Sequence, residues 1–265
     1  MRHLPPRVAA LGGGVVASLI LLNAGQWSAR AQTGAASATV APTWVRVDTV
    51  RVRPEAWGEY REIERDEVIP ALRKAGVSSR SAWRTAEFGD TYEILFARPI
   101  SDFGEYDAGD SFSRVLAPRE AERLRERLRR CLTDRETSAL VQRTDLSLGE
   151  TRRPFAIVTT LTVAPGRDTE YEGFLRETLP DLKKAGIVFA VYQRVYGHTA
   201  WLLVQNIDTL QELAQPSALF RAFGEEGADR RVRGISGIVT SVERKVLRYD
   251  PELSFAVSGT ATATR

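Results

Sequence analysis

Six side chains on predicted strands have the chemistry to hold a small ligand. They are Arg84, Arg143, Tyr192, Arg194, Tyr196 and Arg244. The two tyrosines and Arg194 alternate along one segment, so they share one face of a strand. Guanidinium and phenol groups beside apolar surface suit a small, mainly apolar ligand that carries an anionic group. The alternative is that the arginines point outward or bind carboxylates of the protein, such as Glu93 or Asp145.

Histidine, the usual residue for metal binding and acid–base chemistry, is scarce in this sequence. Its two histidines are His3 and His198, and His198 lies in a predicted hairpin turn where the other half of the chain has Asp90. A histidine-rich metal site would lack its residues, and a Ser-His-Asp triad would have to use His198 in this turn. No catalytic motif stands out. The sequence therefore predicts no metal and no cofactor, and it favours a non-catalytic role while leaving enzymatic activity open.

Charged runs on two predicted helices have a simpler interpretation. Residues 59–67 interleave five acidic side chains with Arg61 and Arg65, and residues 119–130 alternate arginine with glutamate. Opposite charges three or four residues apart pair along a solvated helix face. We therefore expect both runs to lie on the surface. A helix that binds a partner is the alternative for the second run.

These segments belong to two copies of one unit, residues 43–148 and 154–249. Four landmarks recur in the same order: VRPEAWGEY with VAPGRDTEY, VIPALRKAGV with TLPDLKKAGI, GDTYEILF with GHTAWLLV, and Val141-Gln142-Arg143 with Val242-Glu243-Arg244. A repeat of about 105–110 residues has the size of a domain, unlike the shorter periods of solenoids. By these landmarks Arg84 and Arg194 occupy the same position in the two copies, and so do Arg143 and Arg244. They also predict a second helix about six residues longer in the first copy, around 119–130.

Each copy predicts the order β-α-β-β-α-β. In the second copy, apolar residues and threonines over 155–163 predict a buried strand, and helical spacing follows over 167–185. Pro180 is expected to kink or split that helix near Thr178. A tight hairpin of two strands, a second helical region and a last strand complete the copy. In the first copy the second helical region is expected over 102–133.

The predicted order is the ferredoxin-like arrangement, an antiparallel sheet with both helices on one face. A lone unit would expose the other, apolar sheet face, which is unfavourable in water. Two units in one chain can cover both faces by packing sheet against sheet. The predicted fold class is therefore α+β, with two ferredoxin-like β-α-β-β-α-β repeats packed sheet-to-sheet.

Two stretches carry a resemblance to a known superfamily: VRPEAWGEYREIERDEVIP in the first copy and TVAPGRDTEYEGFLRETLP in the second. They resemble the dimeric α/β-barrel superfamily, particularly its antibiotic-biosynthesis-monooxygenase-like and NIPSNAP-like domains. Because two units usually meet between chains there, the resemblance implies a barrel built within one chain, and a monomer.

The resemblance also implies which strands meet. The second strand of each copy would lie beside the fourth strand of the other, so that Arg84 neighbours Arg244 and Arg194 neighbours Arg143. The superfamily includes haem proteins, which need an axial ligand that is usually histidine. A solvated turn residue such as His198 is a poor candidate for that ligand.

The N-terminus predicts export. A basic start precedes an apolar stretch, and Ala29-Arg30-Ala31 forms a small-x-small cleavage site ahead of Gln32. We therefore expect residues 1–31 to be a signal peptide and the mature protein to be periplasmic or extracellular. We expect residues 32–42 to be a flexible linker and residues 256–265 a flexible tail.

Charge and cysteine content narrow the range of partners. The chain has 37 Lys and Arg against 34 Asp and Glu. Three arginines and no acidic residue lie in residues 1–31, so the mature chain is balanced at 34 of each. This balance gives no reason to expect nucleic acid or a membrane surface as a partner. The one cysteine, Cys131, falls on the apolar face of a predicted helix and is expected to be buried.

Three functions fit these expectations. The leading one is an exported barrel that binds a small, mainly apolar and possibly anionic ligand. The second is a cofactor-independent, monooxygenase-like enzyme, which the resemblance permits. The third is a structural or interaction protein whose barrel is filled by its own side chains. A cavity between the two sheets would favour the first two functions, and a packed interior would favour the third.

Overall fold

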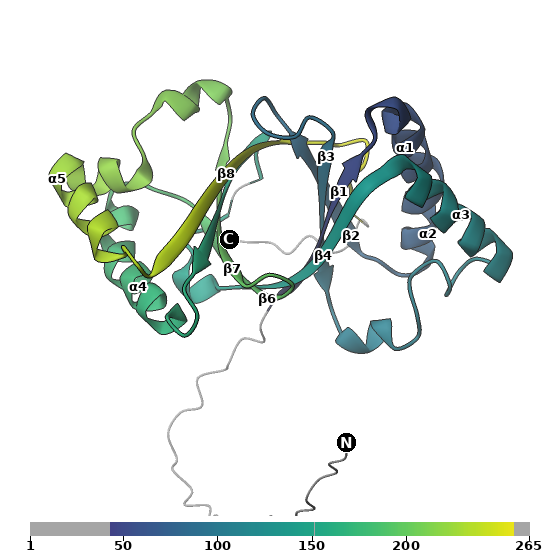
Figure 1. The fold of residues 1–265 in the computed structure, drawn as a ribbon, viewed down its shortest axis with the longest axis horizontal. Helices are drawn as coiled ribbons and strands as arrows, with labels where there is room; N and C mark the ends of the chain where they lie inside the picture. Colours follow the sequence, from purple (N-terminus) through teal and green to yellow (C-terminus); the bar gives the residue numbers. More distant parts are fainter. Residues whose placement is uncertain (1–42, 151, 257–265) are drawn as a thin grey trace, which may run out of the picture. The chain divides into compact units, whose positions relative to one another are not determined.

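The computed structural model describes residues 43–150 and 152–256, which fall within one compact unit (Figure 1). The expected signal peptide (1–31), the linker (32–42) and all but the first residue of the tail (256–265) lie outside the described residues. None of the described helices is long and apolar enough to cross a membrane.

Both halves have the order β-α-β-β-α-β. The first half consists of β1 (Trp44–Val52), α1 (Trp57–Ile63), a π-helical turn (Glu64–Val68), α2 (Ile69–Lys74), β2 (Ser79–Thr85), β3 (Glu93–Ile100), α3 (Pro118–Cys131) and β4 (Leu132–Gln142). The second half consists of β5 (Phe155–Val163), α4 (Asp168–Lys184), β6 (Ala190–Tyr196), β7 (Ala200–Ile207), α5 (Ala218–Gly234) and β8 (Val239–Tyr249). A short strand, β9 (Phe255–Ala256), pairs with β2.

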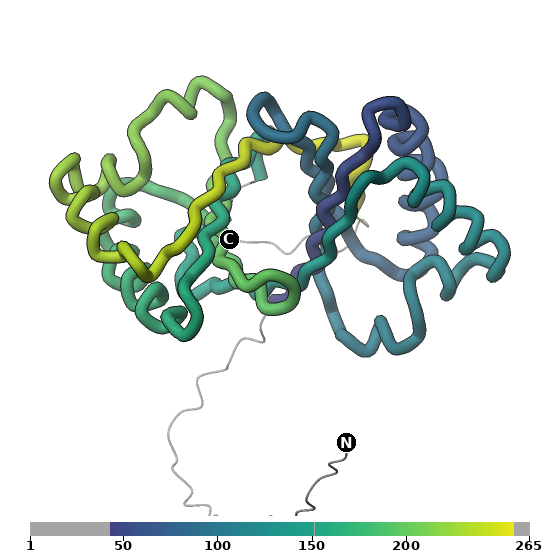
Figure 2. The backbone as a smooth tube through the Cα atoms, viewed as in Figure 1, coloured from purple at the N-terminus to yellow at the C-terminus, as the bar shows by residue number. Residues whose placement is uncertain are grey.

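Eight of the described strands close into an antiparallel barrel. The order around it is β3-β1-β4-β6-β7-β5-β8-β2, and β2 pairs again with β3. The two halves meet at two seams, where β4 pairs with β6 and β2 pairs with β8. In Figure 2 the C-terminal strand β8, coloured yellow, reaches the blue strands of the first half. The predicted intrachain barrel is confirmed.

The register at the two seams differs from the predicted one. Arg84 lies opposite Arg248 rather than Arg244. Arg194 lies opposite Leu140 rather than Arg143. The strands pair as expected but are offset along each other, because closing a barrel requires a stagger between strands that a pairwise comparison of two repeats does not contain.

The inner faces of the two sheets share one apolar cluster, here called the barrel cluster. Its buried members are Val47, Leu140, Ala156, Val158, Ala200, Leu202 and Leu247. They come from both halves, so each sheet buries the apolar face of the other. Apolar side chains therefore line the space in which a ligand was expected.

Helices cover the outer face of each sheet, on opposite sides of the barrel (Figure 1). In the first half, α1, α2 and α3 bury residues such as Ile63, Leu124 and Cys131 against the sheet. In the second half, α4 and α5 cover a separate cluster that includes Tyr171 and Trp201. The expectation that Cys131 is a buried apolar residue is confirmed.

The first helical segment of the first half contains one residue more than that of the second half. Tyr60 and Tyr171 are equivalent and buried, but Pro70 follows the first by ten residues and Pro180 follows the second by nine. The π-helical turn between α1 and α2 absorbs the additional residue. Such turns are rare and often mark functional sites. The corresponding helix of the second half, α4, is not split at Pro180.

The last strands of the two halves, β4 and β8, align differently in the structure than in the sequence comparison. Thr159 of β5 pairs with Arg244, and the equivalent residue of β1, Asp48, pairs with Thr137. The counterpart of Arg244 is therefore Thr137 rather than Arg143. A three-letter match placed these strands, whereas the hydrogen-bonded ladder fixes their true alignment.

The second helical region of the first half is shorter than predicted. A helix was expected over 102–133, but α3 begins at Pro118 and follows a long loop, residues 101–117, that contains a 3-10 turn. The second half makes the same connection with residues 208–217. Long loops inside a compact domain are uncommon and often carry function. No extra helical residues are inserted at 119–130.

The barrel cluster predicts that the two halves unfold together. Leu140 is 2% exposed, and Leu140→Ala is expected to lower the free energy of unfolding by about 2–5 kcal/mol in one cooperative urea transition followed by tryptophan fluorescence. Val242→Ala, at a site 55% exposed on β8, serves as the control and is expected to change it by less than about 0.5 kcal/mol. Two separate transitions, of which only one shifts, would contradict the shared cluster.

Candidate functional site

Two of the six predicted ligand-binding residues lie together on the barrel face. Tyr192 and Arg194 of β6 pair with Leu202 and Ala200 of β7, both members of the barrel cluster. The Tyr192 hydroxyl donates a hydrogen bond to Glu150 at 3.1 Å, and burial together with this carboxylate raises its pKa. The Arg194 Nε is buried without a hydrogen-bond partner among the described residues.

Arg84 and Arg143 lie on the helix-facing side of their sheets instead. Arg84 is the neighbour of the barrel residue Trp83 along β2, so it points the other way, and its Nε is 3.9 Å from Asp250. Arg143 lies over the ring of Trp201 and binds Asp145 at 2.8 Å. Both arginines are therefore engaged within the protein, as the alternative interpretation of the sequence expected.

Arg244 and Tyr196 complete the predicted set and lie apart from each other. Arg244 is exposed on β8. Tyr196 is 60% exposed and stacks against Trp44, with ring centroids 6.0 Å apart. The structure thus does not bring the six residues into one site. A shift of one residue between the compared strands moves a side chain to the opposite face, which explains the dispersal.

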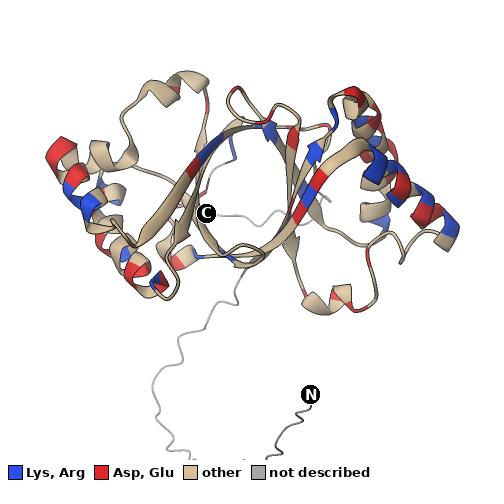
Figure 3. Ribbon diagram, viewed as in Figure 1, with Lys and Arg blue, Asp and Glu red and all other residues tan. Residues whose placement is uncertain are grey.

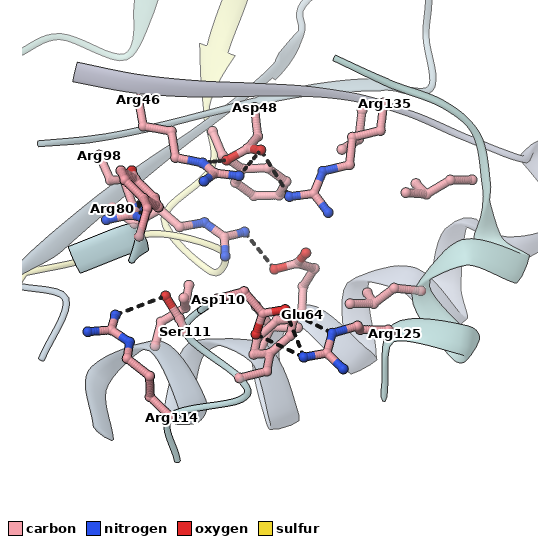
Figure 4. Close-up of a pocket in the computed structure, with 18 of the residues that line it drawn as sticks. Arg46, Asp48, Glu64, Arg80, Arg98, Asp110, Ser111, Arg114, Arg125 and Arg135 are labelled. Atoms are coloured by element: carbon pink, nitrogen blue, oxygen red, sulfur yellow. Dashed lines mark hydrogen bonds and ion pairs between the residues drawn. The ribbon is translucent and has the colours of Figure 1, made fainter. Parts of the chain in front are cut away.

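A charged cavity of about 200 Å³ lies between the sheet and the helices of the first half. Its charged lining residues are Arg46, Asp48, Glu64, Arg80, Arg98, Glu105, Asp110, Arg114, Arg125 and Arg135. Apolar residues that include Val50, Phe96, Phe112 and Leu128 form the rest of its wall. Figure 4 shows the charged groups entering from the sheet on one side and from loop 101–117 and α3 on the other. We call this space the first-half cavity.

On the sheet side, Asp48 binds two arginines. Arg46 donates to both of its carboxylate oxygens, at 2.8 and 2.9 Å. Arg135 donates at 2.9 Å, and the Thr137 hydroxyl donates at 2.6 Å. Burial opposes ionisation of Asp48, but the hydrogen bonds and charges of the arginines outweigh it and hold its pKa well below the ordinary value.

Glu64 and Arg80 form an ion pair that is almost fully buried, with exposures of 5% and 6%. Arg80 Nη2 donates to Glu64 Oε2 at 2.5 Å, and the Tyr60 hydroxyl donates to Glu64 Oε1 at 2.8 Å. The guanidinium of Arg80 lies 3.6 Å above the Phe96 ring centroid. Its Nε is buried and has no hydrogen-bond partner among the described residues. This arginine is therefore fixed in orientation with one donor left over.

On the other side of the cavity, two further ion pairs involve loop 101–117. Arg98 donates to Glu105 and to the Tyr106 hydroxyl, both at 3.0 Å. Arg125 of α3 donates to the two carboxylate oxygens of Asp110 at 2.9 and 3.0 Å. Counted over its lining residues, the cavity holds six arginines and four carboxylates.

The second half has mostly apolar side chains at the equivalent positions. The strand register and the helix alignment identify the equivalent positions of the two halves. The first half has Arg46, Glu64, Arg80, Arg98 and Arg135, and the second half has, in the same order, Ile157, Leu175, Phe189, Gln205 and Val242. Leu175 and Phe189 are buried in the core of the second half. The fold therefore forms without these charges.

The residues of the first-half cavity do not fit a haem iron held by histidine. His198, the one histidine within the described ranges, is exposed in the β6–β7 hairpin and does not line the cavity. The lining contains no cysteine or methionine, and its tyrosines are hydrogen-bonded to Glu64 and Arg98. In the described part of the chain, no cluster of three or more His, Cys, Asp or Glu side chains has the geometry to hold a metal ion.

Solved structures share this architecture. An anthrone oxidase-like protein matches with a TM-score of 0.50 and 11% identity, over 84% of this chain and 97% of its own. A variant of the chlorite dismutase of Candidatus Nitrospira defluvii matches with a TM-score of 0.52 and 11% identity, over 80% and 92%. A proposed monooxygenase of Fusobacterium nucleatum matches with a TM-score of 0.51 and 11% identity, over 79% and 93%.

The chain has the fold of the dimeric α/β-barrel superfamily. At such low identities the similarity concerns the fold and not the activity. No family model matches the sequence, and no curated protein sequence matches it either. The function of this dimeric α/β barrel therefore has to be argued from its own residues.

The first-half cavity was not predicted from the sequence, because Glu64 was assigned to a solvated helix face. Its side chain is buried, and Arg61 on the same helix binds Asp250 beyond β8 instead of pairing along the helix. Two signals were available: the extra residue between Tyr60 and Pro70, and a glutamate where the second copy has an apolar residue.

The charged run at 119–130 follows the surface interpretation in part. Acidic and basic residues alternate along the α3 ribbon in Figure 3, and Arg129 binds Glu122 at the surface. Arg125, however, turns toward Asp110 and lines the cavity. One face of α3 is thus solvated while its edge contributes to the site.

The ion pairs of Asp48 predict a dependence of stability on pH. Because its pKa is lowered by folding, its contribution is complete above about pH 4, the ordinary value, and is lost as the pH falls below that toward the folded value. Asp48→Asn is expected to lower the free energy of unfolding at pH 6 by about 1–3 kcal/mol, and by a smaller amount at pH 3, where part of the contribution of the ionised carboxylate has been lost. Urea unfolding at both pH values measures this, with the exposed Asp107→Asn as control. An equal loss at both pH values would refute the assignment.

Proposed function

We propose that the protein binds a small anionic molecule in the first-half cavity rather than inside the barrel. The single observation that carries this proposal is the excess of arginine over carboxylate around a partly enclosed space, at positions where the second half has mostly apolar residues. Arginine is the side chain best suited to charge-assisted hydrogen bonds with carboxylate or phosphate. Solved structures with this fold include a chlorite dismutase and a proposed monooxygenase, which is in keeping with a small-molecule site.

The energetics of the Glu64–Arg80 pair support this role. A buried ion pair pays a large desolvation cost, and well-packed apolar residues of similar volume often stabilise a protein as well or better. The second half uses Leu175 and Phe189 at the same two positions. Since stability alone does not explain the pair, its retention supports a role for the Arg80 guanidinium in binding a ligand.

The barrel face is the second candidate site. Arg194 there also has a buried Nε without a partner among the described residues, and Tyr192 lies beside it. Two members of the apolar barrel cluster, Leu202 and Ala200, lie opposite these side chains. A variant of Arg194 separates the two sites experimentally.

The proposed function is tested by copying the second half into the first. The double variant Glu64→Leu, Arg80→Phe is expected to keep its melting temperature within a few degrees of wild type, because it removes both charges and leaves neither buried alone. It is expected to lose at least tenfold in affinity for hexanoate, a carboxylate with a short apolar body, measured by isothermal titration calorimetry.

Arg194→Gln is the matched control and is expected to bind hexanoate as the wild type does. A loss of binding in Arg194→Gln, with full binding in the double variant, would place the ligand in the barrel and overturn the proposal. Native mass spectrometry of protein purified from its own compartment provides an independent readout, because it detects a retained ligand directly.

Export is part of the proposed function, and it is supported by the basic, apolar and small-x-small order of residues 1–31. When the full chain is expressed in a Gram-negative bacterium, the protein recovered from the periplasm or the medium is expected to begin at Gln32. N-terminal sequencing of each fraction measures this. Recovery of the intact chain from the cytoplasm alone would contradict export.

A further inference from the structure

We infer that the ligand is a dianion with one negative group at each end and an apolar middle, the class of the α,ω-dicarboxylates. This inference rests on the proposed function and deepens it. Three observations carry it: how the charges of the cavity are paired, where the unmatched arginines lie, and which apolar residues line the cavity.

Most of the arginines in the cavity already have a carboxylate of their own. The one-to-one pairs are Glu64 with Arg80, Glu105 with Arg98 and Asp110 with Arg125. In each pair the charges cancel. These six residues contribute no net charge, although their guanidinium groups remain available for hydrogen bonds to a ligand.

The remaining charged residues leave an excess of two positive charges. Asp48 is shared by Arg46 and Arg135, so one of these two arginines is not neutralised. Arg114 contacts the Ser111 hydroxyl at 3.4 Å and forms no ion pair among the described residues. Arg114 is exposed and Arg135 is half exposed, so both can be reached from solvent. Two unmatched guanidinium groups at one cavity favour a ligand that brings two negative charges.

The unmatched groups lie on opposite sides of the cavity. Arg46 and Arg135 extend from the sheet, whereas Arg114 extends from loop 101–117 at the other side (Figure 4). A compact anion such as inorganic phosphate would bind either the arginines of the sheet or Arg114. A molecule with two separated anionic groups can bind both at once.

Apolar residues also line the cavity. Val50, Phe96, Phe112 and Leu128 are among its lining residues, and they offer contact surface to methylene groups. The cavity volume of about 200 Å³ corresponds to roughly seven water molecules at about 30 Å³ each. A chain of about six carbon atoms therefore fits.

The test compares adipate with hexanoate, which has the same six carbons and a single carboxylate. Isothermal titration calorimetry on the wild-type protein is expected to show adipate binding about tenfold more tightly. In Arg114→Gln, adipate is expected to lose that advantage while hexanoate affinity stays within twofold. Arg129→Gln, which removes an exposed α3 arginine outside the cavity, is the control and is expected to change neither affinity.

The outcomes separate this inference from the proposed function. Equal binding of adipate and hexanoate, with both lost in Glu64→Leu, Arg80→Phe, would overturn the dianion and leave the anion site standing. Tighter binding of inorganic phosphate than of adipate, unaffected by Arg114→Gln, would point to a compact anion and also overturn it. Failure of all three probes to bind the wild type would overturn both.

Discussion

The barrel depends on mutual burial of two apolar sheet faces. Each ferredoxin-like half leaves one face of its sheet without helices, and the barrel cluster covers that face with the sheet of the other half. The seams at β4–β6 and β2–β8 pair every strand on both sides, so the barrel has no open sheet edge. This closure accounts for the architecture without reference to any ligand.

The same constraint leaves the helix-facing sides of the two halves free to differ. The second half fills its side with apolar residues, including Leu175 and Phe189. The first half has Glu64 and Arg80 at those positions, together with a π-helical turn and a longer loop, 101–117. Within one chain, the second half thus shows what the fold requires, and the first half shows what has been added to it.

The added features are costly in isolation and consistent with one another. A buried glutamate requires a partner, which Arg80 supplies, and Tyr60 satisfies its other oxygen. The π-helical turn begins at this glutamate. The loop supplies Asp110 and Arg114 to the opposite wall. These features meet at one cavity, which supports a binding role better than unrelated drift of one repeat would.

The fold followed from the sequence because it rests on long-range repetition. Four landmarks, two periodicities and an uncovered sheet face were sufficient to predict two β-α-β-β-α-β units packed sheet against sheet. Such features survive errors of a few residues in where each element begins or ends.

The site did not follow, because single residues determine it. Whether a side chain faces the barrel or the helices changes with a shift of one residue, and the strand stagger of a closed barrel is not contained in either repeat alone. The sequence therefore left open which face Arg84 and Arg143 occupy, and the structure places both on the helix-facing side. Glu64, which was expected on a solvated helix face, is buried. A search for positions that are charged in one copy and apolar in the other, instead of positions that are identical, would have singled out Glu64.

A crystal structure of the protein with 6-bromohexanoate tests the central claim most directly, because anomalous scattering locates the bromine independently of any interpretation. The account predicts one bromine peak per chain, between the sheet and the helices of the first half, with the carboxylate bound by cavity arginines. A peak inside the barrel, or in the helix-covered core of the second half, would contradict it.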